Sequence, residues 1–467
     1  MPSRTVLDRG VRPAPILAAL LIAVAALELL ARFSGLQAVQ TAAWAAMILV
    51  VAFALRRLTL REVYLLSASA VLTVLVLLTQ PDPPGILAGA LNQAAFLMTF
   101  ILLLGLLQAT AATSPSVAIM GEYLTRQPPG RRYVALNGGT SLLAVLFNIG
   151  VVSFLVPLIQ QGIRRAAPGD ALNPIREQRQ ISALLRGFAW SVTWSPTAFA
   201  PLIVAELMPG VERSAWIGYG LALFAALMAL GWLEDRIRFR AYKPKGLRQP
   251  MPFPRTAAAR FAATTCWFLA LVVAFVWAFG ESAVFGVLAA CPVMVIGWLI
   301  AQGGTTALPA RLRRIAGTEL PGSVNVAITL ACSGYIGRAA AGLTPAAEVA
   351  EALGLAGMPD WLLLASIPSF LTLISLLALS PTMMAVFMGS FFAALPEMPA
   401  DATLLAFSIS CGWAVSMTFS PFATVVLVIA RASGLPARRL TWGWNLQFTL
   451  MSALLMYPVF YLLTGGQ

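Results

Sequence analysis

The chain contains no histidine, and only 10% of its residues are charged. Without histidine it has no Ser–His nucleophile pair, no HExxH zinc site and no His-ligated haem. No aspartate lies within an apolar run, which argues against an intramembrane aspartyl protease, and there is no Walker A phosphate loop. We therefore expect no enzyme, no catalytic residue, no metal site and no direct use of ATP.

Cysteine is also scarce. The four thiols, Cys266, Cys291, Cys332 and Cys411, lie far apart in sequence and inside apolar runs. This spacing suggests neither a disulfide framework nor a zinc site, and we expect all four to be small core residues.

Apolar residues, in contrast, make up 59% of the chain. They recur in runs of about 17–25 residues, the length that crosses a bilayer core. The first run is long enough to span and is not followed by a signal cleavage site. The sequence thus predicts an all-α polytopic protein of a bacterial-type inner membrane, with spans near 16–31, 39–55, 64–79, 87–109, 187–206, 215–233, 261–279, 283–301, 323–343, 403–430 and 441–463.

Charge sets the expected topology of two further apolar stretches, 134–160 and 361–395. If each enters the membrane and returns on the same side, every Lys and Arg except Arg32, Arg213 and Arg338 is cytoplasmic. We therefore predict about 11 transmembrane helices plus two re-entrant hairpins, a cytoplasmic N-terminus and an extracytoplasmic C-terminus. The alternative is that both stretches are ordinary helices. The net charge of +13 reflects this patterning and does not indicate a nucleic-acid partner.

A short pattern occurs twice. Residues 193–196 read Thr-Trp-Ser-Pro and residues 418–421 read Thr-Phe-Ser-Pro, each within an apolar run. Proline breaks helices, and a broken helix in lipid requires protein or a wet cavity around its freed backbone groups. Each pattern follows a hairpin interrupted at Asn148 or at Ser380-Pro381-Thr382. Matching breaks in two halves predict a transporter substrate site.

These landmarks divide the chain into expected segments. We expect N-terminal scaffold helices (1–109), repeat 1 (110–233, with hairpin 134–160 and broken helix 187–206) and a basic cytoplasmic linker (234–260). The second half has scaffold helices (261–322), repeat 2 (323–430, with hairpin 361–395 and broken helix 403–430) and a C-terminal helix (431–467). The two repeats have inverted topology.

On these residues the chain resembles the ion transporter superfamily, as a divergent member. That group includes divalent anion:sodium symporters, arsenite permeases, citrate carriers and p-aminobenzoyl-glutamate transporters. The resemblance covers about 110–206 and 323–430 and is carried by Phe147-Asn148-Ile149, Ser195-Pro196-Thr197, Ser380-Pro381-Thr382 and Ser420-Pro421-Phe422. It implies hairpin tips and breaks that converge near the membrane centre. It also implies that the hairpins and broken helices move in an elevator-like way against a scaffold formed by 16–109 and 215–301. The same resemblance implies a homodimer.

The expected substrate-binding residues are the polar residues at these four interruptions: Asn148, Thr193, Ser195, Thr197, Ser380, Thr382, Thr418 and Ser420. Helix termini present unpaired N–H groups that suit an anion, and freed carbonyls suit a small cation. Support is expected from Asn137, Thr140 and Ser141. Alternatively, each hydroxyl only bonds the preceding helical turn.

Other side chains have two readings each. Arg338 is the only basic residue placed well inside a span, so it either contacts an anionic substrate or reaches the interface. Glu28 and Glu206 carry a proton or, more simply, sit at outer helix ends. The aromatic residues Trp190, Trp194, Trp413 and Phe419 flank the breaks, where they wall a pocket or fill space.

The sequence therefore predicts a secondary transporter that moves a small organic or inorganic anion by alternating access. No nucleotide-binding motif is present, so Na+ or H+ are the candidate coupling ions and no other cofactor is expected. The apolar flanks favour a monoanion or an amphipathic organic acid. The alternatives are a passive channel or facilitator, an exporter of an amphipathic or apolar compound on the same fold, an embedded enzyme, and a partner subunit.

Overall fold

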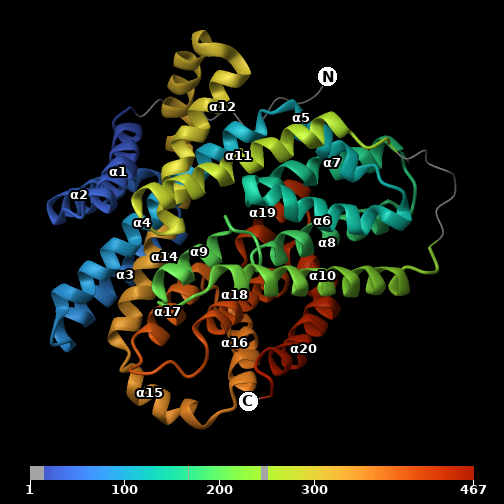
Figure 1. Cartoon of the computed structure of the whole chain (residues 1–467). Coiled ribbons are helices and arrows are strands. Elements are labelled where there is room, and N and C mark those ends of the chain that lie inside the picture. Colours follow the sequence, from blue (N-terminus) through green and yellow to red (C-terminus); the bar gives the residue numbers. More distant parts are fainter. Residues whose placement is uncertain (1–14, 167, 243–250, 467) are drawn as a thin grey trace. The chain divides into compact units, whose positions relative to one another are not determined.

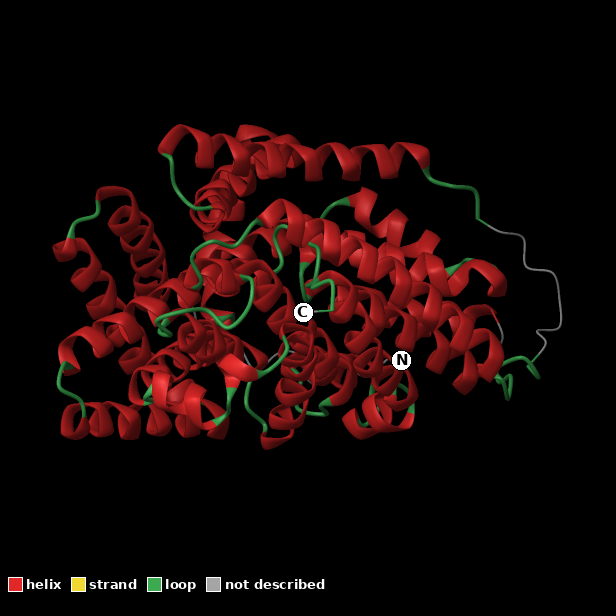
Figure 2. Cartoon of the chain, turned by 60° about the horizontal axis from the view of Figure 1, so that its bottom comes forward, coloured by secondary structure: helices red, strands yellow, loops and turns green. Residues whose placement is uncertain are grey.

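The computed structural model describes residues 15–166, 168–242 and 251–466. All regular structure in this part of the chain is helical (Figures 1 and 2). When consecutive helices that continue one another are counted as one, eleven of the described helices are long and apolar enough to cross a membrane. The predicted all-α polytopic architecture is confirmed, and the protein is an integral membrane protein.

The set of candidate spans differs from the prediction at two places. Residues Asp360–Leu377 are apolar enough to span, although the sequence predicts one arm of a re-entrant hairpin there. The predicted span 187–206 is absent from the set because its two halves are separate helices, one of them long and charged and the other short.

The chain folds into two compact units. Unit 1 contains residues up to Ala111 and residues Phe268–Leu343. Its helices are α1 (Pro15–Ser34), α2 (Gln37–Ala54), η1 (Leu55–Arg57), α3 (Leu60–Thr79), α4 (Pro83–Ala112), the second half of α11 (Arg255–Phe279), α12 (Ala283–Arg314), η2 (Ile315–Glu319), α13 (Leu320–Gly322) and α14 (Val324–Leu343).

Unit 1 buries charge as well as apolar surface. Glu28 is 1% exposed and accepts hydrogen bonds from Arg32 Nε (3.1 Å) and Gln40 Nε2 (3.0 Å). Glu62 is also buried: it caps the start of α3 together with Thr59, and it accepts a hydrogen bond from Thr329 Oγ1 (3.1 Å). Glu28 lies near the end of α1, and both of its carboxylate oxygens accept hydrogen bonds inside the unit.

Unit 2 contains residues Ala112–Trp267 and Thr344–Gln467. Its first segment holds α5 (Pro115–Thr125), α6 (Pro129–Phe147), α7 (Gly150–Ala166), α8 (Asn173–Ser191), α9 (Phe199–Leu207), α10 (Arg213–Arg238) and the first half of α11. Its second holds α15 (Ala346–Ala352), η3 (Leu355–Gly357), α16 (Asp360–Ile374), η4 (Ser375–Leu377), α17 (Pro381–Ala393), α18 (Ala402–Phe419), α19 (Thr424–Ser433), η5 (Arg439–Gly443) and α20 (Leu446–Leu463).

Sequence chemistry explains where several of these helices begin and end. Proline occupies the first turn of α5, α6, α8 and α17, where its missing N–H costs nothing. Ser380 and Asp401 cap α17 and α18 by accepting backbone hydrogen bonds at 3.1 and 3.0 Å. Gly434 closes α19 in a left-handed conformation.

Helix packing within unit 2 repeats itself. α6 packs on α8 as α16 packs on α18, and α8 and α18 contact each other. α7 packs on α19, and α17 packs on α9. The second arm of each hairpin therefore contacts the second half of the other broken helix, as two repeats related by a pseudo-twofold axis require. Figure 1 shows the first set in green and the second in orange and red.

Two glycines permit close contact between each hairpin and the first half of its broken helix. A Cβ on Gly187 would lie 2.2 Å from the backbone oxygen of Asn137, so α8 meets the backbone of α6 directly. A Cβ on Gly412 would lie 2.5 Å from the Leu371 side chain and 3.1 Å from Pro368 Cα, at the α16–α18 contact. Gly187 and Gly412 thus each allow the first half of a broken helix to pack closely on a hairpin helix.

The units cut across the segments expected from the sequence. α14 (Val324–Leu343), expected in repeat 2, clusters with unit 1. α10, expected in the scaffold, clusters with unit 2. The predicted linker 234–260 is largely the end of α10 and the start of α11, and its residues 243–250 lie outside the described chain.

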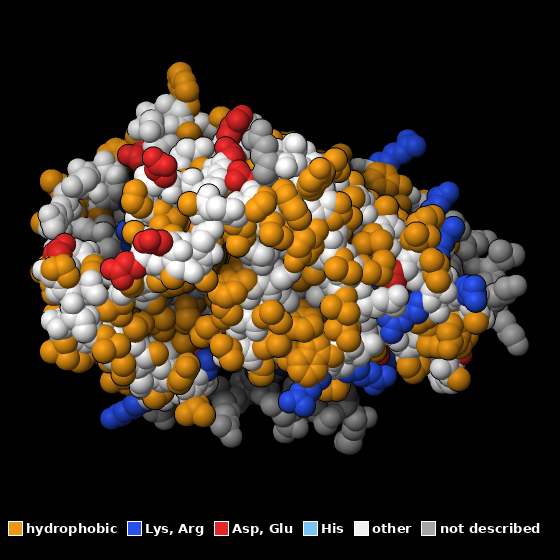
Figure 3. All heavy atoms as spheres, turned by 90° about the horizontal axis from the view of Figure 1, so that it is seen from below, with side chains coloured by type: hydrophobic (Ala, Val, Ile, Leu, Met, Phe, Trp, Pro, Cys, Tyr) orange, Lys and Arg blue, Asp and Glu red, His pale blue; other side chains and the backbone are white. Residues whose placement is uncertain are grey.

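Apolar side chains dominate the outer surface. In Figure 3 they cover most of the visible face, while charged side chains lie mainly towards its margins. Exposed apolar residues are especially dense on α3 and α11, where Leu78 is 77% and Trp277 87% exposed. Cys266 is exposed on α11, whereas the other three cysteines are buried, so the expectation that all four lie in the core is wrong for Cys266.

Candidate functional site

Eight of the nine predicted binding residues lie at the four interruptions of unit 2. Hairpin 1 (α6 and α7) turns at Asn148, and hairpin 2 (α16, η4 and α17) turns just before Ser380. The first broken helix is α8–α9 and the second is α18–α19. The ninth residue, Arg338, belongs to unit 1, where its Nε lies 3.4 Å from the position of a Cβ on Gly89.

Each hairpin tip contains a non-glycine residue with a positive φ. Asn148 has φ 43° and Ala378 has φ 61°, and they are the only non-glycine residues with positive φ in the described chain. Ala378, with ψ 15°, lies in the left-handed helical region, which costs about 1–2 kcal/mol for a residue with a Cβ, whereas Asn148, with ψ −130°, lies outside that region. Backbone strain concentrates where function requires a fixed shape. The tips are therefore candidate functional elements on structural grounds alone.

At the first break the predicted hydroxyls are turned inward. Thr193 Oγ1 donates to the carbonyl of Trp190 (2.8 Å), which is the local bond to the preceding turn. Thr197 Oγ1 donates to the carbonyl of Val145 (2.5 Å), close to the tip of hairpin 1. Ser195 Oγ lies 3.3 Å from Thr197 Oγ1, and all three residues are at most 2% exposed. These groups tie the break to hairpin 1.

The second break is built in a parallel way. Ser420 Oγ donates to the carbonyl of Ser375 (2.9 Å), at the end of α16. Thr418 Oγ1 donates to its own preceding turn (3.0 Å) and accepts a hydrogen bond from Thr449 Oγ1 (2.9 Å). Ser420 thus connects break 2 to hairpin 2, as Thr197 connects break 1 to hairpin 1. Thr382 is buried in the first turn of α17.

The parallel extends to sequence position. Gly187 and Gly412, Thr193 and Thr418, and Ser195 and Ser420 form three pairs whose residue numbers all differ by 225. The first residues of α9 (Phe199) and α19 (Thr424) also differ by 225, so each pair lies equally far before the second half of its broken helix. The repeat inferred from two short motifs therefore extends back into α8 and α18, at the glycines where these helices meet the hairpins.

The groups that remain accessible at the interruptions are mostly apolar. Leu377 and Ala378 are exposed at the tip of hairpin 2, and Phe422 is exposed just after break 2. Asn148 and Trp194 are half-buried at hairpin 1 and break 1. A ligand that reaches these positions would meet the Asn148 amide and several apolar walls, with few free hydroxyls.

The flanking aromatic residues divide into two groups. Trp190 and Trp413 are buried, and the Trp413 ring packs edge-on against Phe199 at a centroid distance of 5.8 Å. Trp194 and Phe419 are half-buried. Trp194 Nε1 donates to Ser141 Oγ (3.1 Å), which connects break 1 to α6. Packing accounts for the first two side chains, while the second two lie where a ligand could touch them.

Two further support residues on α6 have unused polar atoms. Asn137 Nδ2 donates to the carbonyl of Ala183 (3.3 Å) on α8. Asn137 Oδ1 and Thr140 Oγ1 are buried, and neither has a hydrogen-bond partner among the described residues. The two residues lie about one helical turn apart on α6, so their oxygens are available to a water molecule or a small hard cation.

The sequence did not single out a buried ion pair in unit 2. Arg186 is 2% exposed in α8, and its NH1 lies 2.7 Å from Glu234 Oε2 on α10. Its Nε donates to Asn445 Oδ1 (2.8 Å), and its guanidinium lies 4.2 Å from the Phe448 ring centroid. Arg186 is therefore buried within unit 2, although the sequence places it just before an apolar run. The sequence signal for this pair was the opposite charge of Arg186 and of Glu234 and Asp235. All three residues lie in helices that extend beyond the apolar runs.

This ion pair connects to the second break. Asn445 accepts from Arg186, and its carbonyl accepts a hydrogen bond from Thr449 Oγ1 (3.0 Å). Thr449 Oγ1 in turn reaches Thr418 Oγ1. On the other side, Glu234 Oε1 lies 3.3 Å from Arg238 NH1. A continuous polar chain thus runs from the end of α10 to break 2.

No group of three or more His, Cys, Asp or Glu side chains that could hold a metal ion occurs in the described ranges. Glu206 is half-buried near the end of α9. The electrostatic groups of the candidate site are therefore backbone termini, amides and hydroxyls.

Known proteins were compared with this arrangement. No protein-family model matches the sequence, and no curated protein matches it. The fold resembles that of a known transporter. The crystal structure of the Alcanivorax borkumensis YdaH transporter, which has an unusual topology, aligns with a TM-score of 0.52 over 87% of this chain and 98% of that chain. The aligned sequences are 15% identical, so the likeness establishes the fold.

Proposed function

We propose that the protein is a secondary active transporter for a small organic anion with an apolar part. One observation carries this proposal: two strained hairpin tips and two broken helices gather in unit 2 in a repeated arrangement. Interrupted helices in matching places are the signature of transporter binding sites near the bilayer midplane. The structural likeness to a transporter supports the same conclusion.

The chemistry of the interruptions favours an amphipathic anion over a small, highly charged one. The N-terminal ends of α7, α9, α17 and α19 each supply backbone N–H groups with partial positive charge. The hydroxyls of Thr197 and Ser420 are occupied by internal bonds, while Leu377, Phe422 and Trp194 are accessible. A monoanion with an apolar or aromatic part fits these groups. An exporter of an amphipathic compound on the same fold is the second candidate, favoured by the same accessible apolar residues.

Coupling to an ion gradient is part of the proposal, with Na+ and H+ as the candidates. The buried oxygens of Asn137 and Thr140 support Na+, because this ion prefers oxygen ligands and these two have no partner in the described chain. A Thr140→Val variant would remove one ligand while keeping the shape of the side chain. If Na+ is coupled there, ligand binding should lose its dependence on Na+ and keep its dependence on pH.

An elevator-like motion is proposed with unit 2 as the mobile domain and unit 1 as the scaffold and dimer contact. Spin labels on Leu78 (unit 1) and Leu462 (unit 2), both strongly exposed, would report the distance between units. The proposal predicts a distance distribution that shifts with ligand. A distribution unchanged by ligand and ions would contradict it. The cytoplasmic N-terminus and extracytoplasmic C-terminus remain predictions, testable with a C-terminal fluorescent protein that is dark outside the cytoplasm.

The first test is ligand binding by thermal shift on purified protein. Benzoate, succinate and sulfate would be compared with and without Na+ and at two pH values. A ligand that binds only the native state stabilises it by an amount that grows with the logarithm of the ligand concentration relative to Kd. We expect stabilisation by the aromatic carboxylate that is lost in Asn148→Ala and kept in Asn92→Ala, which changes an asparagine in unit 1. Equal responses in the two variants, or stabilisation only by uncharged apolar compounds, would contradict an anion site at hairpin 1.

A further inference from the structure

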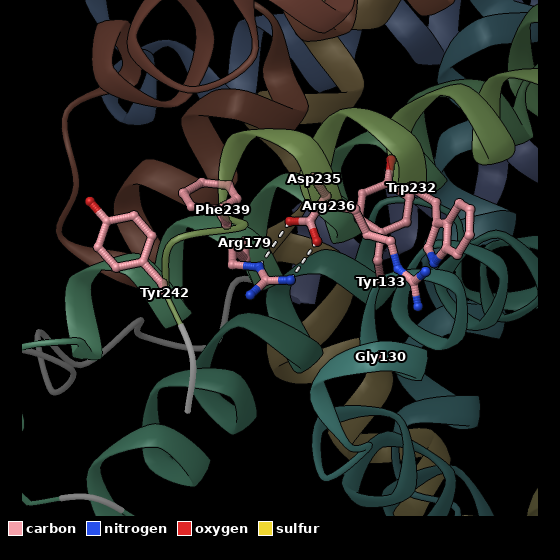
Figure 4. A pocket seen from close by; sticks show the side chains of 8 residues that line it. All are labelled: Gly130, Tyr133, Arg179, Trp232, Asp235, Arg236, Phe239 and Tyr242. Atoms are coloured by element: carbon pink, nitrogen blue, oxygen red, sulfur yellow. Dashed lines mark hydrogen bonds and ion pairs between the residues drawn. The ribbon is translucent and has the colours of Figure 1, made fainter. Parts of the chain in front are cut away.

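A pocket of about 200 Å³ lies away from the hairpin tips, at one end of unit 2. It forms where the first turn of α6, the helix α8 and the last turns of α10 meet (Figure 4). Its walls are mainly aromatic and basic: Tyr133, Arg179, Trp232, Arg236 and Tyr242 line it together with Asp235. No part of the proposed transport mechanism uses this pocket.

One of its two arginines is neutralised and the other is not. Arg179 forms two parallel hydrogen bonds with Asp235, at 3.0 and 2.6 Å. Arg236 has no carboxylate partner in the described part of the chain, and its guanidinium lies 4.3 Å from the Trp232 ring centroid. The pocket therefore carries net positive charge, held by a guanidinium that a flat aromatic face positions.

The start of α6 adds to this charge. The NH2 atom of Arg236 lies 4.0 Å from the position of a Cβ on Gly130, in the first turn of that helix. The first turn of a helix presents N–H groups and the positive end of its dipole. An anion held by Arg236 would thus also lie near the positive end of the α6 dipole.

The surface next to the pocket is apolar. On α10, Tyr219, Leu221, Leu233 and Ile237 are all exposed, and this exposed stripe runs along the helix to Arg236. In a membrane protein, such a stripe faces lipid tails, while Trp, Tyr and Arg mark the headgroup level. Charge balance places this end of unit 2 on the cytoplasmic side, the side rich in basic residues.

We propose that this pocket binds the phosphate headgroup of an anionic phospholipid from the cytoplasmic leaflet. Arg236 would hold the phosphate oxygens through its planar fork, as guanidinium groups do. Trp232 and Tyr242 would flank the headgroup, and the acyl chains would lie along Leu233 and Ile237. Basic pockets between helices on the cytoplasmic side are suited to such headgroups. A free phosphate ester carries the same anionic group but has no acyl chains that could pack on the apolar stripe.

The test is native mass spectrometry of the full-length protein in detergent, titrated with phosphatidylglycerol or phosphatidylcholine. Four proteins would be compared: wild type, Arg236→Ala, Arg236→Lys and Arg313→Ala. Arg313 is an exposed arginine near the end of α12, so its variant loses the same charge at another place. Thermal unfolding of each variant checks folding, and Arg236 is exposed, so its removal should leave the melting temperature without lipid unchanged.

We expect wild type to prefer phosphatidylglycerol, and Arg236→Ala to bind it about fivefold more weakly, the effect of one basic residue near a membrane surface. Arg236→Lys should bind phosphatidylglycerol with an affinity between those of wild type and Arg236→Ala, because it keeps the charge but loses the planar fork. Arg313→Ala should match wild type. Equal binding of the two lipids, or equal losses in Arg236→Ala and Arg313→Ala, would overturn the proposal. So would displacement of phosphatidylglycerol by millimolar inorganic phosphate, because the site would then recognise a soluble anion.

Discussion

Removing the carboxylate that faces Arg186 should be one of the most damaging single changes in unit 2. The variant Glu234→Leu leaves a guanidinium that is 2% exposed, with the uncharged side chains of Asn445 and Tyr133 as its polar neighbours. Stranding one member of a buried ion pair costs about 3–5 kcal/mol, because the remaining charge has lost both water and its counterion.

The reverse change should cost less. In Arg186→Met, Glu234 keeps Arg238 at 3.3 Å, and the Arg238 side chain is one-third exposed, so the carboxylate retains a partner and some solvent contact. The double variant Arg186→Met/Glu234→Leu removes both charges and should recover most of the loss, since apolar replacement of a buried pair is often neutral. The expected order of stability is wild type and double variant, then Arg186→Met, then Glu234→Leu.

A second ion pair with the same N–O distance but exposed side chains serves as the control for the effect of burial. Arg126 and Glu122 also lie 2.7 Å apart, but their side chains are 54% and 43% exposed. Glu122→Leu should therefore cost less than about 1 kcal/mol. The assay is thermal unfolding in detergent, followed by tryptophan fluorescence. If Glu234→Leu lowers the melting temperature no more than Glu122→Leu does, the reasoning from burial is refuted.

Three other changes test the packing and the tips. Gly187→Ala places a Cβ 2.2 Å from a backbone oxygen of α6 and should lower the free energy of unfolding by about 1–3 kcal/mol. Gly218→Ala, whose Cβ meets open space, should instead stabilise α10 by up to about 1 kcal/mol. Ala378→Gly should stabilise by about 1 kcal/mol by relieving its positive φ, and Ala394→Gly, whose φ is −87°, should instead destabilise by about 0.5–1 kcal/mol. Ser420→Ala should cost about 1–3 kcal/mol because it leaves a buried carbonyl of η4 without its donor. Thermal unfolding of the five variants checks all three, and a reversed sign in either glycine–alanine comparison would refute its argument.

The architecture could be predicted because its signals are strong and local. Apolar runs, prolines within them and basic clusters between them each have one dominant physical cause. The Thr-x-Ser-Pro patterns fall at the two helix interruptions of the structure, and Asn148 falls at a hairpin tip. These positions follow from backbone chemistry, which a sequence displays directly.

The partners of the polar side chains could not be predicted. Thr197 and Ser420 look available to a ligand in the sequence, but each donates to a carbonyl on a hairpin, 52 and 45 residues away. Arg186 reads as a loop residue because it stands just before an apolar run, yet α8 begins at Asn173 and a distant carboxylate permits its burial. Pairing across helices depends on tertiary contacts that no local pattern encodes. The strain at Ala378 was invisible for the same reason.

The most direct test of transport is accumulation in proteoliposomes. Purified protein would be reconstituted with a stabilising ligand in radiolabelled form, and Na+ or pH gradients would be imposed separately. A secondary active transporter predicts a transient internal concentration above the external one with one of these gradients, abolished by the matching ionophore and reduced in Asn148→Ala. Flux that only equilibrates the ligand under every gradient would contradict active transport and leave a passive facilitator on the same fold.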